Sequence, residues 1–341
     1  MGDYFSITEL YKYRTAFNFV IGGRGTGKTY GALMDCVLNK RKIMFMRRSQ
    51  TQLQQVFDVK TVETENGVKK VSLSPFKPVE RDLGIEVQIE KINKDLYAFF
   101  LDGFHLGYGC ALNTLNNLRG FDASDIDYLI FDEFIPLPGE MVKKDEARIF
   151  LDAYESINRN REFTGKPPLF AYLLANANDI DCPILLDMGL TEVIEKMINK
   201  GRRFICNKSE EYTVSLLENK SFEEKKRNTA IYRFTKKMRY NAMAFENKFA
   251  YDDFSDIASK DIREYTVQYS VGEYYFYRHK SRDEIYISKC RMTTKENYPE
   301  TEYGLQQCRV AHGRELYGAY MENRIKFETY RAKKLLTDLV A

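Results

Sequence analysis

Two short segments carry side chains that could handle a phosphate ester. The first is Gly22-Gly23-Arg24-Gly25-Thr26-Gly27-Lys28-Thr29, which fits G-x-x-x-x-G-K-[ST] in full. Its glycines let backbone N–H groups approach phosphate oxygens closely, and a helix that opens here presents an anion-binding N-terminus. In this pattern the lysine, Lys28, neutralises the β- and γ-phosphates, and the Thr29 hydroxyl binds Mg²⁺. The segment therefore predicts a site for ATP and Mg²⁺.

The second segment is Leu129-Ile130-Phe131-Asp132-Glu133, an apolar run that ends in two carboxylates. A buried strand that ends this way directs Asp132 at the metal ion. The next residue, Glu133, is then placed to polarise an attacking water as a general base. The alternative is an acidic pair in a loop after a core strand. With the glycine-rich segment present, the pair favours hydrolysis by water over transfer to a small-molecule acceptor, so a small-molecule kinase is the least favoured class.

Two weaker signals follow farther along the chain. Asn176 ends the apolar run Leu173-Leu174-Ala175 and could sense the γ-phosphate through a water; a turn-forming asparagine is an equal alternative. Arg159 and Arg161 follow a helical pattern. Either could stabilise transition-state charge in a neighbouring subunit, although basic residues at helix ends more often interact with the helix dipole or with solvent.

The elements that must position these residues follow from hydrophobic periodicity. Short apolar runs alternate with helical segments, which predicts an α/β domain with a parallel sheet. We expect strands at residues 17–21, 42–46, 128–131 and 169–175, and helices at 27–38 and 145–160. Alternation on both sides of Asp102-Gly103 predicts an antiparallel hairpin within residues 85–110.

The second half of the chain has a different composition. We expect a P-loop ATPase domain over residues 1–220, a charged helical linker over 221–255 and a small α+β domain over 256–341. In the last part, strands are expected at 265–269, 274–277 and 284–287, and residues 309–340 are expected to be largely helical.

The charge of the chain is only mildly basic, with a formal net charge of +3 and a sequence pI of about 8.3. A polyanion site therefore has to come from local clusters. Lys69 and Lys70 lie in a polar stretch, Glu63 to Ser74, which we expect to be a mobile loop. Further candidate nucleic-acid contacts are Lys225, Lys226, Arg227, Lys236, Lys237, Lys333 and Lys334. Each cluster has the alternative of being a solvated face.

Other classes of protein are disfavoured. The six cysteines and three histidines are scattered without metal-ligand spacing, which favours free thiols in a reducing compartment. The first residues lack the pattern of a secretory signal, and no stretch approaches the ~20 apolar residues of a membrane span. We expect a cytoplasmic protein without a membrane partner.

These motifs together resemble the phi-29-like phage DNA-packaging ATPases, which are terminase-like motors. The resemblance rests on Asn18 to Thr29, with its arginine at Arg24, and on a strand that ends in Arg47-Arg48. It continues through Ile130 to Ile135 and through Arg159-Asn160-Arg161-Glu162. Asn176-Ala177 resembles a Ser-Asn-Ala segment of that family, but Ala175 replaces the serine, so only the asparagine role carries over. Glu246 to Phe249 and the region from Arg314 to Leu339 resemble its C-terminal part more loosely.

The resemblance implies a homo-oligomeric ring on the capsid portal that drives double-stranded DNA into a procapsid in the host cytoplasm. It implies that Arg159 is the finger that acts on the neighbouring subunit. It also implies a C-terminal domain with an RNase H-like, nuclease-derived fold that no longer cuts, and a structural RNA as a partner of some members.

Two rival functions remain at this stage. A large terminase would also cut DNA, and its nuclease would need several carboxylates that converge from strands. The first strand expected there, Tyr265 to Tyr269, has no acidic residue, and Glu273, Asp283 and Glu284 fall near turns. The other rival is a nucleotide-dependent switch that grips DNA or a partner without processive motion.

Overall fold

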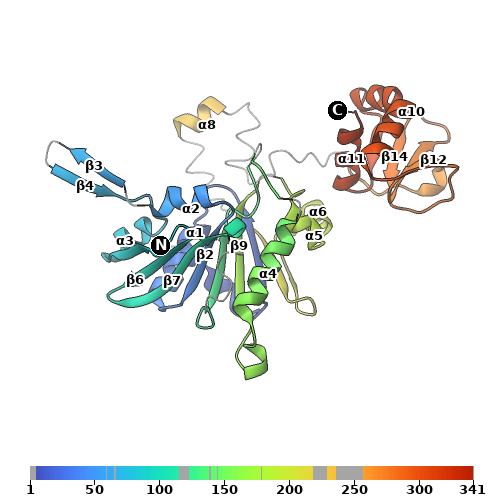
Figure 1. Cartoon of the computed structure of the whole chain (residues 1–341). Helices are drawn as coiled ribbons and strands as arrows, with labels where there is room; N and C mark the ends of the chain where they lie inside the picture. The colour runs from blue at the N-terminus through green and yellow to red at the C-terminus, as the bar shows by residue number, and fades with distance from the viewer. Residues whose placement is uncertain are drawn as a thin grey trace. The chain divides into compact units, whose positions relative to one another are not determined.

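The chain folds into two compact units in this computed structural model (Figure 1). The first unit comprises Met1–Leu190 and Lys200–Tyr251, and the second comprises Thr191–Asn199 and Asp252–Ala341. The structure describes residues 5–58, 60–64, 67–114, 123–137, 140–143, 145–177, 179–217, 229–235 and 256–340. The expected fold class, a parallel-rich α/β domain followed by a smaller α+β domain, is confirmed.

A nine-stranded sheet forms the centre of the first unit, in the order β10-β11-β1-β9-β8-β2-β7-β6-β5. All pairs from β11 to β7 are parallel, whereas β10, β6 and β5 add antiparallel edges. The strands are β1 (Phe17–Gly22), β2 (Ile43–Arg47), β5 (Val87–Lys91), β6 (Leu96–Leu101), β7 (Phe104–Ala111), β8 (Tyr128–Asp132), β9 (Phe170–Asn176), β10 (Phe204–Asn207) and β11 (Tyr212–Leu217).

The central strands are apolar because both faces of the sheet are covered. Every residue of β8 is buried, and so are five of the six residues of β1. The helices of this unit are α1 (Lys28–Leu38), α2 (Gln50–Phe57), α3 (Lys77–Leu83), α4 (Glu146–Asn158), α5 (Pro183–Asp187) and α8 (Ala230–Thr235). The strands and helices predicted in the first half are all present, including the hairpin at Asp102-Gly103, where β6 pairs with β7.

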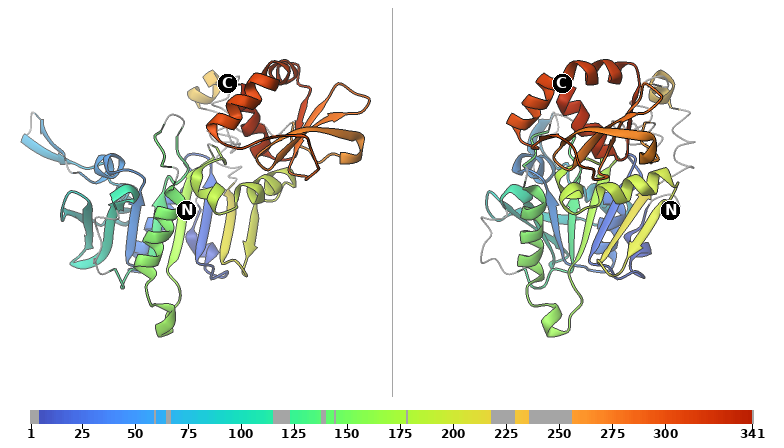
Figure 2. Two further views of the ribbon diagram at one scale, coloured as in Figure 1. Left: turned by 45° about the vertical axis from the view of Figure 1, so that its right-hand side comes forward. Right: turned by 90° about the vertical axis from the view of Figure 1, so that its right-hand side faces the viewer.

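The polar stretch from Glu63 to Ser74 corrects one expectation, because it is not a loop. It belongs to a β-hairpin of β3 (Lys60–Thr64) and β4 (Gly67–Val71), which extends away from the nine-stranded sheet (Figures 1 and 2). Asn66-Gly67, with β-branched residues on both sides, is a hairpin signal that the polar composition obscured. The pairing places Lys69 opposite Val62 and Lys70 opposite Thr61.

The second unit contains a five-stranded sheet in the order β15-β12-β13-β14-β16. The strands β12 (Tyr265–Val271), β13 (Tyr274–His279) and β14 (Ile285–Ser288) form an antiparallel meander, as predicted. The remaining elements are β15 (Glu296–Tyr298), α10 (Glu302–Met321), β16 (Ile325–Phe327), α11 (Tyr330–Val340) and α6 (Thr191–Asn199). Residues 309–340 are largely helical, as expected, although β16 separates the two helices.

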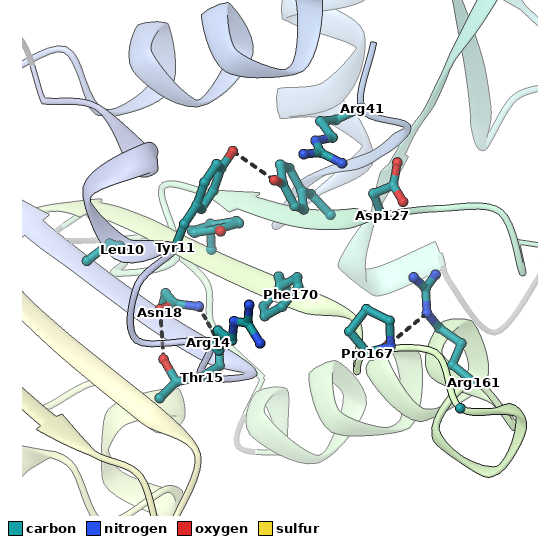
Figure 3. Close-up of a pocket in the computed structure, with 13 residues that line it drawn as sticks. Leu10, Tyr11, Arg14, Thr15, Asn18, Arg41, Asp127, Arg161, Pro167 and Phe170 are labelled. Atoms are coloured by element: carbon teal, nitrogen blue, oxygen red, sulfur yellow. Dashed lines mark hydrogen bonds between the residues drawn. The ribbon is translucent and has the colours of Figure 1, made fainter. Parts of the chain in front are cut away.

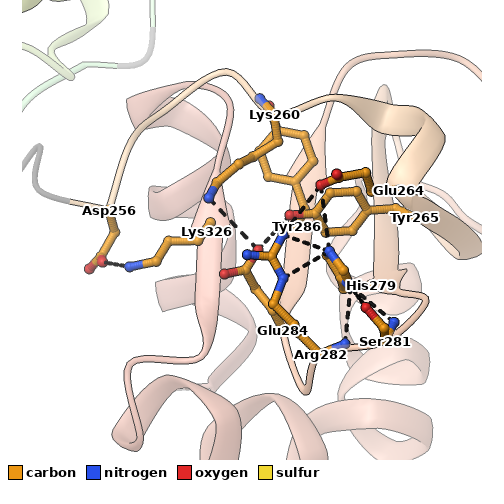
Figure 4. A network of polar contacts seen from close by, with 10 residues as sticks. All are labelled: Asp256, Lys260, Glu264, Tyr265, His279, Ser281, Arg282, Glu284, Tyr286 and Lys326. Atoms are coloured by element: carbon orange, nitrogen blue, oxygen red, sulfur yellow. Dashed lines mark hydrogen bonds and ion pairs between the residues drawn. The ribbon is translucent and has the colours of Figure 1, made fainter.

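Polar residues at one edge of this second sheet are extensively paired (Figure 4). Glu264 lies 3.3 Å from Arg282, and Glu284 accepts a hydrogen bond of 2.5 Å from Tyr265. Asp283 pairs with Arg324 at 2.9 Å, and Glu273 pairs with Lys289 at 3.0 Å. The carboxylates considered for a nuclease site thus each have a basic or phenolic partner. In the described part of the chain, no group of three or more His, Cys, Asp or Glu residues could hold a metal ion.

Candidate nucleotide-binding site

The glycine-rich segment connects β1 to α1 in the geometry that a phosphate-binding loop needs. Gly25 and Gly27 have φ angles of 81° and 83°, in the left-handed region where a side chain would be strained. Gly27 is also the N-cap of α1, so the first backbone N–H groups of that helix point into the loop. The folded loop therefore forms an anion site at a helix N-terminus.

Lys28 lies inside this loop and is 8% exposed. Its Nζ donates to the carbonyl oxygens of Gly22 and Gly23 at 3.0 and 2.9 Å. It also lies 3.3 Å from Oδ1 of Asn176, which ends the neighbouring strand β9. The register of the sheet explains this contact, because Gly22 of β1 is opposite Asn176. The structure thus brings together Lys28 and Asn176, which the sequence assigned to one site.

The two predicted metal ligands are also in contact. The Thr29 hydroxyl donates to Oδ1 of Asp132 at 2.8 Å, and Asp132 is 4% exposed. Burial raises the pKa of the Asp132 carboxyl, while the Arg47 guanidinium and the Thr29 hydroxyl oppose that rise. A hydroxyl and a carboxylate at one place are hard oxygen ligands of the kind that Mg²⁺ takes. These residues fit the expected metal ion.

Glu133 adopts a backbone conformation that is uncommon for a side-chain-bearing residue. Its φ angle is 60°, directly after the buried strand β8, and its side chain is 46% exposed. Such strained positions cost roughly 1–3 kcal/mol and cluster at functional sites. Because of this turn, the two adjacent carboxylates differ in exposure. Asp132 is buried, whereas the Glu133 side chain is about half exposed within the cavity.

A single cavity of about 510 Å³ joins these residues, a size typical of small-molecule sites. Three cationic side chains and two carboxylates line it, which suits a polyanion with a bound metal ion. The lining residues are Arg24, Gly25, Gly27, Lys28, Thr29, Tyr30, Arg47, Pro75, Pro78, Asp132, Glu133, Ala175 and Asn176.

Arg47 is the site residue that the sequence did not assign. It ends β2, whose Met46 is opposite Phe131 of β8, so Arg47 lies beside the acidic pair. Its Nη2 lies 2.9 Å from Asp132 and its Nη1 lies 2.5 Å from Glu133. The only sequence signal for Arg47 is that a basic residue ends a predicted parallel strand. The strand order of the folded sheet is needed to show that this strand lies next to β8.

The adjacent Arg48 does not line this cavity but is buried in contact with other parts of the fold. Its side chain is 5% exposed, and its Nε lies 3.2 Å from Oε1 of the buried Glu146 at the start of α4. Burial raises the pKa of Glu146 to about 7, although the Arg48 charge opposes that rise. Arg48 also donates to the Phe134 carbonyl, so it fixes the chain that follows Glu133.

Arg159 lies near the opposite edge of the sheet. The acidic pair lies at the carboxyl end of β8, whereas α4 returns the chain toward the start of β9, and Arg159 is the residue that directly follows α4. Arg161, two residues on, donates to the carbonyl of Ile126, just before β8 begins. Arg159 is exposed and has a φ angle of 42°. This placement separates Arg159 from the phosphate-binding loop of its own chain by the length of a strand.

The predicted nucleic-acid contacts are described only in part. Lys69 and Lys70 lie on β4, while Lys225, Lys226, Arg227, Lys236 and Lys237 fall outside the described residues. Lys333 is on α11, where its Nζ lies 3.8 Å from Asp256, and Lys334 lies over the Tyr330 ring at 5.5 Å from its centroid. Lys333 and Lys334 therefore each interact with another residue of the chain. A contact of either lysine with DNA remains a prediction.

Comparisons with known proteins bear on the whole chain. The family described as Podovirus DNA encapsidation protein (Gp16) matches residues 2–308. The DNA packaging protein of Bacillus phage phi29 is 21% identical over 354 residues, which covers 98% of this chain and 96% of that protein. The DNA packaging protein of Bacillus phage PZA is 21% identical over 266 residues, with 76% and 70% covered.

Solved structures give the same fold. A chain of the bacteriophage Phi-29 viral genome packaging motor assembly has a TM-score of 0.67 at 19% identity, covering 99% of this chain and 100% of that one. A chain of the Phi-28 gp11 DNA packaging motor has a TM-score of 0.52 at 17% identity, covering 100% and 98%. Among the described residues, no helix has the length and apolar character needed to cross a membrane.

Proposed function

The chain belongs to the podovirus DNA encapsidation (Gp16) family, and from this premise we propose that it is the ATP-hydrolysing motor that packages double-stranded viral DNA. The observation that carries the ATPase assignment is the contact of Thr29 with Asp132 beside Lys28 and Glu133. Two residues from the start of α1 and two from the end of β8 thereby converge on one cavity of about 510 Å³.

Each residue of the cavity has a definite role in this proposal. The loop from Gly22 to Thr29 cradles the phosphates of ATP with its N–H groups, and Lys28 neutralises their charge. Thr29 and Asp132 would hold Mg²⁺, which would supply neutralisation of phosphate charge at this place. Glu133 accepts the proton of the attacking water, and Asn176 orients that water near the γ-phosphate.

Arg159 completes the site of a neighbouring subunit in a homo-oligomeric ring. Its position at the edge of the sheet opposite the phosphate-binding loop supports action between subunits. In a head-to-tail ring, one face of each subunit contacts the other face of the next. Hydrolysis is then coupled to ring assembly, because an isolated subunit lacks the arginine that stabilises the transition state.

The partners follow from the same proposal. The ring acts on the capsid portal in the host cytoplasm, with double-stranded DNA in its channel and a structural RNA as a further partner. Contacts to DNA are sequence-independent and come from lysine and arginine, so they weaken as salt rises. The β3–β4 hairpin with Lys69 and Lys70 extends from the sheet and is a suitable element to reach DNA.

We expect double-stranded DNA to stimulate ATP hydrolysis by the purified full-length chain, because a motor couples turnover to its track. Release of inorganic phosphate is measured with and without DNA over a range of salt concentrations. Stimulation that declines with salt supports the motor. ATP turnover that stays indifferent to DNA, even when purified portal is added to assemble the ring, would instead favour a nucleotide switch.

A second expectation concerns Arg47, which binds the carboxylates that Mg²⁺ and water need. In Arg47→Met, the Mg²⁺ concentration for half-maximal hydrolysis should fall by roughly tenfold, equivalent to about 1.4 kcal/mol. Because Arg47 opposes the raised pKa of Asp132, the variant should also move the acid limb of the pH–rate profile to higher pH. Steady-state hydrolysis is measured against Mg²⁺ at several pH values.

The matched control is Arg81→Met, which removes an exposed arginine from α3. It should change neither the Mg²⁺ dependence nor the pH profile. If Arg47→Met gave the same two curves as the unaltered chain, Arg47 would be uncoupled from the acidic pair.

A further inference from the structure

A second cavity lies on the edge of the large sheet opposite the phosphate-binding loop (Figure 3). It has a volume of about 570 Å³ and is formed where β1, β8 and β9 begin. Its lining residues are Leu10, Tyr11, Arg14, Thr15, Asn18, Arg41, Asp127, Tyr128, Arg161, Gly165, Pro167, Phe170 and Tyr172. The ATP site described above shares none of them.

Three arginines reach this cavity from separate parts of the chain. Arg14 follows the first 3-10 turn, Arg41 precedes β2 and Arg161 follows α4. Figure 3 shows their side chains on different sides of the cavity. The guanidinium groups of Arg14 and Arg41 have no hydrogen bond or ion pair within the described part of the chain, and both residues are exposed. Three positive charges therefore converge on one space.

A single carboxylate, Asp127, faces these three arginines in the lining, so the formal charge of the cavity is +2 (three arginines minus one aspartate). One Asp127 oxygen already accepts the Lys42 backbone N–H at 3.0 Å. Arg161 uses its Nε and Nη1 on the carbonyls of Pro167 and Ile126. The remaining positive charge at Arg14 and Arg41 calls for an anionic ligand.

Aromatic rings form the apolar part of the lining. Tyr128 packs edge-on against Tyr172 and Phe170, with centroids 5.2 and 6.3 Å apart. The Arg41 guanidinium lies over the Tyr128 ring at 5.9 Å from its centroid. Arginine beside aromatic rings binds flat, delocalised groups in a way that lysine does not. The cavity is therefore suited to an anion that carries a planar ring.

Tyr172 supplies the second, independent sign of a ligand. Its side chain is 2% exposed, yet its hydroxyl has no hydrogen-bond partner in the described part of the chain. By contrast, the Tyr128 hydroxyl donates to Tyr11 at 2.7 Å, and Tyr11 donates to Asp35. The Tyr172 hydroxyl is not enclosed, because Tyr172 lines the cavity and its oxygen is reached from that space. It is therefore available to donate a hydrogen bond to a ligand.

We propose that this cavity binds a nucleoside phosphate at a site separate from the ATP-hydrolysing one. Arg14 and Arg41 bind the phosphate, the base packs on Tyr128 and Phe170, and Tyr172 donates a hydrogen bond to it. The volume of about 570 Å³ suits a nucleotide and exceeds what a single carboxylate side chain fills. The ligand is either a free nucleotide or the phosphorylated end of a nucleic-acid strand, because both present the same chemistry.

The test uses the full-length chain with Lys28→Ala, which removes phosphate binding at the first site. Equilibrium dialysis with labelled AMP and ATP, and separately with a short 5′-phosphorylated oligonucleotide, should show one remaining equivalent of bound ligand. Adding Arg14→Ala and Arg41→Ala should weaken that binding by at least about tenfold. Arg81→Ala with Arg148→Ala, two exposed arginines elsewhere on this unit, is the matched control and should leave binding unchanged.

Tyr172→Phe separates ligand binding from a structural role. If the hydroxyl serves a ligand, the variant should bind nucleotide several-fold more weakly while its thermal stability stays unchanged, since this hydroxyl makes no hydrogen bond within the described part of the chain. Binding of mononucleotides identifies a free nucleotide as the source, and binding of the oligonucleotide alone identifies a strand end. The proposal is overturned if the Lys28→Ala chain binds neither nucleotide nor oligonucleotide. It is also overturned if inorganic phosphate competes for this site as well as the nucleotide does.

Discussion

Replacing Glu133 with glutamine is expected to lower the rate of ATP hydrolysis by about 10²- to 10⁴-fold while ATP binding persists. The amide keeps the shape of the side chain but cannot accept the proton of the attacking water. Lys28, which we propose binds phosphate, and the proposed metal ligands Thr29 and Asp132 are unaltered in this variant. Single-turnover hydrolysis in the presence of DNA measures the rate, and retention of labelled ATP on the protein measures binding.

Two matched variants make this result specific to Glu133. Glu155→Gln removes an exposed carboxylate from α4 and should hydrolyse ATP at the normal rate. Arg47→Met removes the cation that pairs with both Glu133 and Asp132 but keeps the Glu133 carboxylate, so it reports the loss of these ion pairs without loss of the base. If Glu133→Gln retained more than about a tenth of normal turnover, general-base catalysis would have to be assigned to another group.

The sequence predicts those parts of the candidate site that are formed by residues close together along the chain. A phosphate-binding loop needs glycine at specific positions, and Gly25 and Gly27 do have the positive φ angles that the pattern requires. Asp132 and Glu133 were identified in the same way, since a fully apolar strand precedes them. The backbone turn that exposes Glu133 and buries Asp132 was not foreseeable, because no residue type at that position requires it.

Contacts that depend on strand order could not be read from the chain. Arg47 lies 85 positions before Asp132, and the two meet only because β2 is the neighbour of β8. The second cavity has the same origin, since Arg14, Arg41 and Arg161 come from three connections that the sheet brings together. Sequence periodicity identifies strands, but it does not give their lateral order.

Two elements that were not predicted, α2 and the β3–β4 hairpin, do have local signals in the sequence. Ser49 and Gln52 form the capping box that begins α2, a pattern visible as S-x-x-Q. Asn66-Gly67 marks the β3–β4 hairpin. The three-residue strand β16 is different, because Ile325 to Phe327 is too short for alternation to distinguish it from the helical pattern on both sides.

Arg159→Ala is expected to have the largest effect, a loss of about 10³- to 10⁵-fold in hydrolysis by assembled rings with ATP binding preserved. The expectation rests on the proposed action of Arg159 on a neighbouring subunit, since Arg159 lies near the edge of the sheet opposite its own phosphate-binding loop. Arg148→Ala, an exposed arginine on the same helix, should remain active. Arg159→Lys, which keeps the charge but loses the guanidinium fork, should recover only a minor part of the rate.

Mixed rings test the direction of this contact. In the proposed ring, each active site takes Glu133 from one subunit and Arg159 from the next, so Arg159→Ala and Glu133→Gln subunits lack different halves of it. In a 1:1 mixture that assembles randomly, about a quarter of the interfaces in a head-to-tail ring hold both intact residues. The mixture should therefore hydrolyse ATP although each variant alone does not. If Arg159 acted within its own chain, every subunit would stay defective and mixing would restore nothing.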